Sequence, residues 1–253
     1  LAQGIWSDLE SGFRGIAPTG NVMSTAVPMH YRVRAIPPPP TNMVYIPQGW
    51  FDQGNSMDPD EGLVMELPVH AVHVTGFWMD RYEVTGKLWA DVRKWTLPSK
   101  YQFEHQGQAQ ASDHPVYGLD WFDCVKWCNA RSEMESLRPC YYLDAEHTLV
   151  YRSGTNDLQN SWVDWEADGY RLPTESEWEK AARGGVNGHR FPWADDTIRH
   201  GRSNYAAGGE YPYDLSSGAN PPDFLHPDFD DSGLPYTSPV GTFAGNGYGL
   251  YDM

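Results

Sequence analysis

A chain of 253 residues with 18 Lys and Arg against 34 Asp and Glu carries a formal net charge of −16. The length suffices for one large domain or two small ones, so no disulfide framework is needed to bury a core. The negative charge disfavours nucleic acids and anionic membrane surfaces as main partners, because both are polyanions. Hydrophobic residues make up 40% and aromatic residues 14%, which excludes a disordered chain.

Glycine and proline are spread along the whole chain, with 25 glycines and 20 prolines. This distribution predicts short helices and strands joined by many ordered loops. No stretch approaches 18 consecutive apolar residues, so we predict no membrane span. The sequence begins with Leu1, and no charged segment followed by an apolar run precedes the fold. We therefore expect any secretion signal to have been removed or to lie outside this sequence.

The N-terminal part contains one clear strand pattern. In MHYRVRAI at 29–36, apolar and polar residues alternate. Four consecutive prolines at 37–40 predict a stiff, extended spacer, so we divide the chain into a strand segment at 1–36, a linker at 37–42 and a main domain at 43–253. A single strand needs a partner sheet, which is either in its own main domain or, by strand addition, in a neighbouring copy.

Three helices are predicted in the main domain from their capping residues. The first follows Thr85, the second begins near Asp120, and the third begins at Thr174 with Glu177 completing a capping box. We expect the charged residues of the second helix to face solvent. The apolar stripes are expected to hold Leu88, Trp89, Val92 and Trp95 in the first helix, and Trp121, Cys124, Val125 and Cys128 in the second.

The third helix lies in a charged block, RLPTESEWEKAARGG, that invites a catalytic interpretation. Its charged residues are Arg171, Glu175, Glu177 and Arg183. A structural interpretation accounts for them better, because the capping box explains Glu177, the helix dipole explains Glu175, and burial explains Trp178. We therefore assign no catalytic residue here.

Strands are predicted at 43–47, at 70–80 and at 149–152, where β-branched and aromatic residues gather. His70 and His73 lie three apart on the second of these strands, hence on opposite faces, which is the wrong disposition for two ligands of one metal. We expect His70 to be structural.

Cysteine is scarce and odd in number, with only Cys124, Cys128 and Cys140. At most one bridge within the chain is possible. Cys124 and Cys128 are four apart on a predicted helix, where bridging geometry is poor, so Cys128 with Cys140 is the preferred pair. The alternative is three free, buried thiols.

Six sequence blocks occur in the order typical of the formylglycine-generating enzyme and sulfatase-modifying factor family, which residues 41–253 resemble. The blocks lie at 43–55, 66–85, 114–130, 169–185, 191–196 and 238–253. The resemblance implies a compact, loop-rich α+β domain with few regular elements, related to the C-type lectin-like fold.

In active members of this family two redox cysteines hold copper and engage the substrate thiol, and they lie in a segment that would follow Met253. None of the three cysteines in the chain matches them. The resemblance therefore implies copper only if that segment is present, and it transfers no catalytic residue to this sequence.

An acidic segment, DFDDSG at 228–233, begins like a calcium-binding loop. The twelfth position is Pro239 rather than Glu, so an EF-hand is excluded. The family resemblance also implies a structural calcium ion, bound by an Asn, carboxylates and backbone carbonyls. The candidate ligands from both arguments are Asn204, Tyr205, Asp228, Asp230, Asp231, Ser232 and Leu234. The alternative is a solvated acidic loop without an ion.

Three hypotheses of function follow. The first is a non-catalytic extracellular or cell-surface module for binding or self-assembly, in which residues 1–36 connect copies into a filament. The second is a formylglycine-generating oxidase whose catalytic segment lies outside this sequence. The third is a lectin-like carbohydrate-binding domain. A glycan or protein ligand would contact loop side chains such as Tyr211, Tyr213, Tyr236 and Tyr248.

Overall fold

The computed structural model describes residues 5–7, 14–16, 42–57, 62–98, 100–208, 211–216, 225–230 and 236–253. The chain forms two compact units, Leu1–Thr41 and Asn42–Met253. In the first unit, β1 (Ile5–Ser7) pairs antiparallel with β2 (Arg14–Ile16). The strand predicted at 29–36 and the proline run lie outside the described residues, so strand exchange between copies stays a prediction.

The second unit contains two antiparallel strand pairs. β3 (Met43–Ile46) pairs with β6 (Phe77–Asp80), and β4 (Gly49–Gln53) pairs with β5 (His70–Val74). The single strand predicted at 70–80 is therefore wrong, because the chain leaves one pair for the other at Thr75 and Gly76. Gly76 permits this crossing, since a Cβ there would collide with the hydroxyl of Tyr45. β4 has no counterpart among the predicted strands.

The strand predicted at 149–152 is also wrong. Within the described residues, Val150 makes only an isolated antiparallel bridge with Tyr142. The segment instead runs as a loop over the helix α2 (Trp121–Met134), and its Tyr151 is fully buried there. The described residues also contain two short 3-10 turns, η1 (Val64–Glu66) and η2 (Asn160–Trp162).

The three predicted helices are confirmed, and each begins after its predicted cap. α1 (Gly86–Trp95) is capped by Thr85 and α2 (Trp121–Met134) by Asp120, whose side chain accepts a 2.7 Å bond from the N–H of Asp123. In α3 (Glu175–Ala182), Thr174 accepts from the N–H of Glu177, and the Glu177 carboxylate accepts from the N–H of Thr174. These bonds satisfy helix-terminal donors that would otherwise lack partners.

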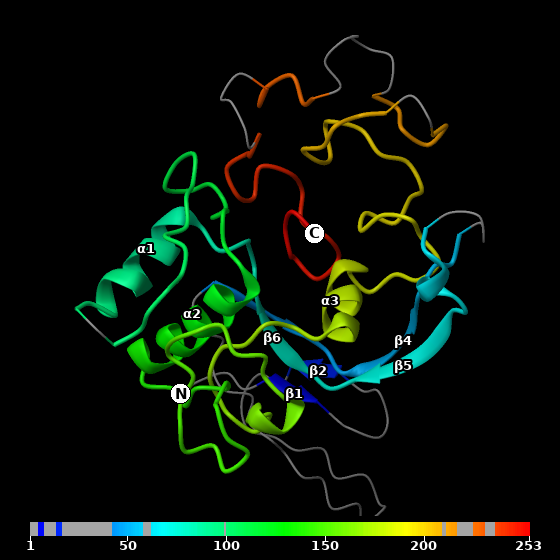
Figure 1. Cartoon of the computed structure of the whole chain (residues 1–253). Helices are drawn as coiled ribbons and strands as arrows, with labels where there is room; N and C mark the ends of the chain where they lie inside the picture. Colours follow the sequence, from blue (N-terminus) through cyan, green and yellow to red (C-terminus); the bar gives the residue numbers. More distant parts are fainter. Residues whose placement is uncertain are drawn as a thin grey trace, which may run out of the picture. The chain divides into compact units, whose positions relative to one another are not determined.

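The main core lies between α1 and α2, which run side by side (Figure 1). Trp89 and Trp127 stack at its centre with ring centroids 5.5 Å apart. A second cluster joins Ile46 of β3, Ala181 of α3 and Leu250 near the C-terminus. Among the described residues, no helix is both long enough and apolar enough to span a bilayer.

The prediction of a solvated polar face on α2 is wrong. Asp123, Lys126 and Asn129 are all fully buried. The segment at 104–105, before α2, binds Asp123, and the loops that follow α2 bind Lys126 and Asn129. Trp121, expected in the core, is 47% exposed at the first position of the helix. The predicted apolar stripe is thus confirmed for the middle of α2 and not for its first residue.

The mixed helices, small sheets and long loops agree with the predicted α+β class. The predicted disulfide between Cys128 and Cys140 is wrong, because Cys124, Cys128 and Cys140 are all free thiols. Cys128 and Cys140 are buried in the α1–α2 core. There they behave as small apolar side chains.

Candidate functional site

The three thiols are unsuited to nucleophilic or copper chemistry. Burial raises the pKa of Cys128 well above its ordinary range and that of Cys140 to about 11. Burial, followed by the negative charge of Asp123, also raises the pKa of the half-buried Cys124. Cys128 and Cys140 are also enclosed in the α1–α2 core, away from solvent and from any substrate, so the three cysteines do not fit an open copper site.

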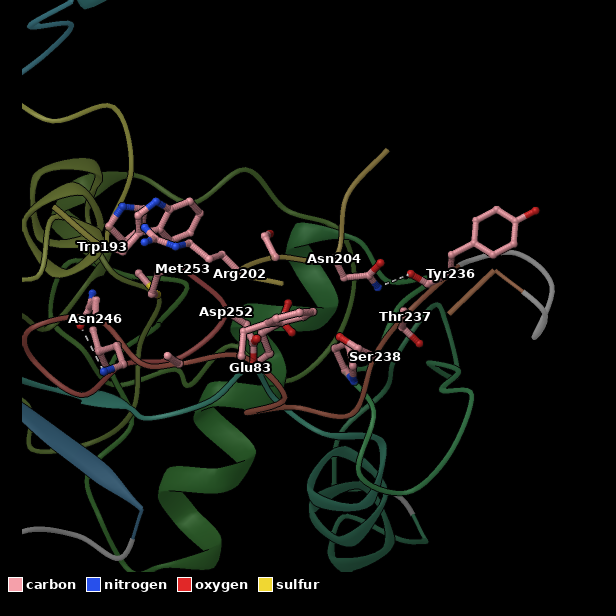
Figure 2. Close-up of a pocket in the computed structure, with 16 residues that line it drawn as sticks. Glu83, Trp193, Arg202, Asn204, Tyr236, Thr237, Ser238, Asn246, Asp252 and Met253 are labelled. Atoms are coloured by element: carbon pink, nitrogen blue, oxygen red, sulfur yellow. Dashed lines mark hydrogen bonds between the residues drawn. The ribbon is translucent and has the colours of Figure 1, made fainter. Parts of the chain in front are cut away.

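A polar pocket of about 220 Å³ lies among the C-terminal loops, and we call it the loop pocket (Figure 2). Its walls come from stretches that are far apart in the sequence, between the end of β6 and the last residues of the chain. The side chains that matter most for its chemistry are Glu83, Trp193, Arg202, Asn204, Ser238 and Asp252.

The side chain of Asn246 holds the loops of the loop pocket in place through four hydrogen bonds. Asn246 donates from Nδ2 to the carbonyls of Ala181 and Ala182 at the C-terminal end of α3. Its Oδ1 accepts from the N–H groups of Tyr248 and Leu250. One side chain thus satisfies orphan carbonyls of the helix and fixes the turn that leads to Asp252.

Arg202 is the cation of the loop pocket, and its charge is already paired. Its guanidinium donates to Asp195 at 2.6 Å and lies 5.4 Å from the ring of Trp193. Asp195 also accepts from the N–H and hydroxyl of Thr197, and these bonds, together with Arg202, lower the pKa of Asp195 to about 2. This arrangement leaves Arg202 neutralised within the wall of the pocket.

Two carboxyl groups, Glu83 and Asp252, lie together in the loop pocket (Figure 2). Glu83 is exposed to solvent, yet the protein packed around its carboxyl, and then the charge of Asp252, raise its pKa. Burial likewise raises the pKa of Asp252, although its Oδ2 accepts a 2.7 Å bond from the N–H of Gly241. Within the described part of the chain, neither carboxyl forms an ion pair with a Lys, Arg or His.

No role is predicted for Glu83 or Asp252 from the sequence. Both lie inside blocks that carry the family resemblance, at 66–85 and 238–253. Only the folded chain brings these two blocks to one cavity. A signal that could have indicated Glu83 is its place as an acidic residue in the loop that follows β6.

The predicted calcium ligands are only partly described. Asn204 lines the loop pocket and donates from Nδ2 to the carbonyl of Tyr236 at 2.8 Å, an orientation that turns its amide oxygen away from that carbonyl. Tyr205 donates its hydroxyl to Asp214 at 2.6 Å. Asp228 and Asp230 lie in the turn at 225–230. Asp231, Ser232 and Leu234 lie outside the described residues, so the complete set stays a prediction.

The charged block around α3 has the structural role that the sequence indicates. Arg171 binds Glu177 through two bonds of 2.6 Å, and Arg183 binds Glu179. Burial alone would raise the pKa of Glu177, but the bonds from Arg171 and Thr174 hold it below its usual value. Trp178 differs from the prediction, because it is 51% exposed rather than buried.

His105, Asp120 and Asp123 form the one group of potential metal ligands found within the described ranges. Their hydrogen bonds are satisfied without an ion. Asp123 accepts from the N–H of Glu104 and from both the N–H and the Nδ1 of His105, and Lys126 lies 3.4 Å away. This group therefore stabilises the start of α2 rather than indicating a metal centre.

Comparison with known proteins identifies the scaffold. The sulfatase-modifying factor enzyme 1-like domain matches residues 33–253. The chain is 34% identical over 186 residues to chaperone protein LppX of Paenibacillus barcinonensis, covering 72% of this chain and 60% of that protein. It is 31% identical over 231 residues to the formylglycine-generating enzyme of Mus musculus, covering 84% and 55%.

An inactive relative matches equally well. The inactive C-alpha-formylglycine-generating enzyme 2 of Bos taurus is 31% identical over 233 residues, covering 84% of this chain and 67% of that protein. The crystal structure of CarF superimposes with a TM-score of 0.58 at 24% identity, covering 84% of this chain and 76% of that one, and it supports the fold. The chain spans only 55% to 60% of the first two relatives.

Relatives named as active and as inactive therefore stand at similar distances, so similarity alone does not decide activity. The order of the six blocks, the match over most of the chain and the α+β architecture agree with one another. The chain belongs to the sulfatase-modifying factor enzyme 1-like domain family.

Proposed function

We propose that the chain is a non-catalytic binding module that holds a cationic side chain of a polypeptide partner in the loop pocket. The observation that carries the proposal is the pair formed by Glu83 and Asp252, two carboxyl groups that share one cavity while its cation, Arg202, is occupied by Asp195. A bound ammonium or guanidinium group would stabilise both carboxylates.

The size of the loop pocket favours a single side chain over a larger ligand. Its volume of about 220 Å³ is below the range of about 300–1,000 Å³ that is usual for small-molecule sites. The net charge of −16 favours a cationic partner, because it attracts positive charge at long range. The burial of Cys128 and Cys140 in the core supports a role other than thiol oxidation.

A peptide array tests the proposal. Peptides that differ at one central position, with Lys, Arg, norleucine or Glu, are probed with the chain and with Glu83→Gln, Asp252→Asn and the exposed control Glu146→Gln. We expect the chain and the control to retain peptides with Lys or Arg, and the two pocket variants to lose them. Retention should strengthen as the pH rises through the raised pKa values of the two carboxyls. Equal retention of all four peptides, whatever their central residue, would contradict the proposal.

The location of the module, its self-assembly and its calcium ion are further proposals. We infer that the module acts outside the cell, that it assembles head-to-tail through residues 1–36, and that calcium orders the acidic loop. Light scattering before and after deletion of residues 1–36 tests the assembly, with loss of large species expected. A melting temperature that does not change with calcium or chelator would remove the calcium proposal.

Formylglycine formation is the second candidate, and the relatives of that name favour it. Its test is incubation of the chain with copper and a Cys-containing sulfatase peptide, followed by mass spectrometry. Conversion of the peptide cysteine to formylglycine would establish this function in place of the first. We expect no conversion by this chain, because Cys128 and Cys140 are buried in the core and burial raises the pKa of all three thiols.

A further inference from the structure

A second cavity, larger and less polar than the loop pocket, lies along the outer side of α3. It measures about 620 Å³, and we call it the α3 groove. It is bounded by α3, by the segment that follows β4, and by the loops around 189–190 and 213. The side chains that determine its chemistry are Asn55, Glu66, Glu175, Trp178, Arg190 and Tyr213. It shares no lining residue with the loop pocket.

One wall of the α3 groove is rigidly held. The N–H of Gly54 donates to Glu179 at 2.9 Å, and the carbonyl of Gly54 accepts from Arg183 at 2.7 Å. Arg183 and Glu179 bind each other at 2.6 Å, so a closed set of bonds ties α3 to the end of β4. Gly54 has a φ of +110°, and a Cβ there would collide with the carbonyl of Glu66. The groove is therefore formed before a ligand arrives.

Aromatic side chains line two sides of the α3 groove. Trp178 leaves 51% of its surface exposed, although it lies in the middle of a well-capped helix. Tyr213 stacks on Tyr211 with centroids 5.1 Å apart, and the Arg190 guanidinium lies 4.1 Å from the Tyr213 ring. These contacts fix Tyr213, while Trp178 offers an indole face to a flat ligand.

The polar groups around these rings include both hydrogen-bond donors and hydrogen-bond acceptors. Glu66 and Glu175 supply acceptors, and Arg190 supplies donors. The amide oxygen of Asn55 is held by the N–H of Met57 at 2.8 Å. The lining carries charges of both signs, so neither an anion nor a cation matches it throughout. Hydroxyl groups donate and accept at once, so a ligand rich in hydroxyls matches this mixed lining.

We propose that the α3 groove is a binding site for a neutral carbohydrate, with Trp178 stacking on the apolar face of one sugar ring. The volume of the groove lies within the range of about 300–1,000 Å³ of ligand sites and accommodates more than one ring. The site is separate from the loop pocket, so its existence does not depend on the function proposed for that pocket.

A glycan array of neutral, sialylated and sulfated glycans, probed with the whole chain, tests the site. The variants are Trp178→Ala and a matched control, Trp121→Ala, whose indole is 47% exposed but does not line the groove. We expect binding to one or more neutral glycans, a loss of at least about tenfold in Trp178→Ala, and unchanged binding in the control.

Several outcomes would overturn the proposal. These are no glycan bound by the chain, equal binding by both variants, binding of charged glycans alone, or capture only of peptides. Circular dichroism of Trp178→Ala confirms that the variant is folded, and partial recovery of affinity in Trp178→Phe distinguishes ring stacking from a structural effect. Glu83→Gln should bind the glycan normally, which separates failure of this site from failure of the loop pocket.

Discussion

Asn129 connects α2 to the loops that cover it, and its replacement should be among the most damaging single changes in the chain. The side chain is fully buried and makes four hydrogen bonds to backbone groups. Nδ2 donates to the carbonyls of Tyr141 and Tyr151, and Oδ1 accepts from the N–H groups of Cys140 and Tyr141. Asn129→Ala leaves all four backbone groups buried without this partner.

Each buried polar group left unsatisfied costs roughly 1–3 kcal/mol. The carbonyl of Tyr141 still accepts from the N–H of Tyr151, so three groups lose their partner. Three such groups give a loss of at least about 3 kcal/mol, against a total of about 5–15 kcal/mol for a typical domain. We therefore expect Asn129→Ala to lose most of its stability, and we expect the loops over α2 to expose part of that helix to solvent. The exposed control Asn160→Ala should stay within about 0.5 kcal/mol of the parent chain.

Urea denaturation followed by tryptophan fluorescence measures both variants, since Trp127 lies in the core beside this network. A loss of less than about 1 kcal/mol in Asn129→Ala, with an unchanged denaturant slope, would refute the reasoning. It would mean that water or shifted loops satisfy these groups at little cost.

Four further changes have defined outcomes. Gly54→Ala should destabilise the chain by roughly 1–3 kcal/mol in urea denaturation, because its φ of +110° and the nearby Glu66 carbonyl leave no room for a Cβ. Arg171→Met should lower the free energy of unfolding by about 2 kcal/mol at neutral pH. Glu177 has a lowered pKa in the fold, so the parent chain loses stability as the pH falls below 4.5, and the variant should lose less. Glu83→Gln should raise the melting temperature at pH 7. A carboxyl with a raised pKa stabilises the fold below pH 4.5, and this contribution is lost as the pH rises through its folded pKa. An unchanged melting temperature at pH 7 would contradict this. Ellman's reagent should label the thiols slowly in the native chain and all three rapidly in urea, whereas fast native labelling would show that they are accessible.

The helix starts were predictable because capping is local. Thr85, Asp120 and Thr174 each bind an N–H within three residues, so the sequence alone contains both partners. The family resemblance rests on block order, and it predicted the α+β class correctly for the same reason, since each block is a continuous stretch. Local signals were sufficient for these features.

The errors concern contacts between distant segments. The polar face of α2 is buried because loops on both sides of the helix in the sequence pack over it. Asp123 binds N–H groups at 104–105, and Lys126 and Asn129 bind carbonyls of the loops after α2. Trp178 occupies a helical position that resembles a core position, yet no described segment covers it completely. Periodicity reports which face of an element is apolar, and it does not report what packs against the other face.

The loop pocket could not be predicted for the same reason. Glu83 lies near the end of one block and Asp252 near the end of another, and neither block has an unusual composition by itself. Their pKa values are raised because folding places them in one partly desolvated cavity. A sequence pattern contains the two residues but not their proximity.

Carbon-13 NMR titration of the Glu83 and Asp252 carboxyls, with and without saturating Nα-acetyl-lysine amide, tests the binding site most directly. We predict that both carboxyls titrate above their ordinary values in the free chain and at lower pH when the amine is bound, with no such change from the norleucine analogue. Titration that is the same with and without the amine would contradict a cation site in the loop pocket.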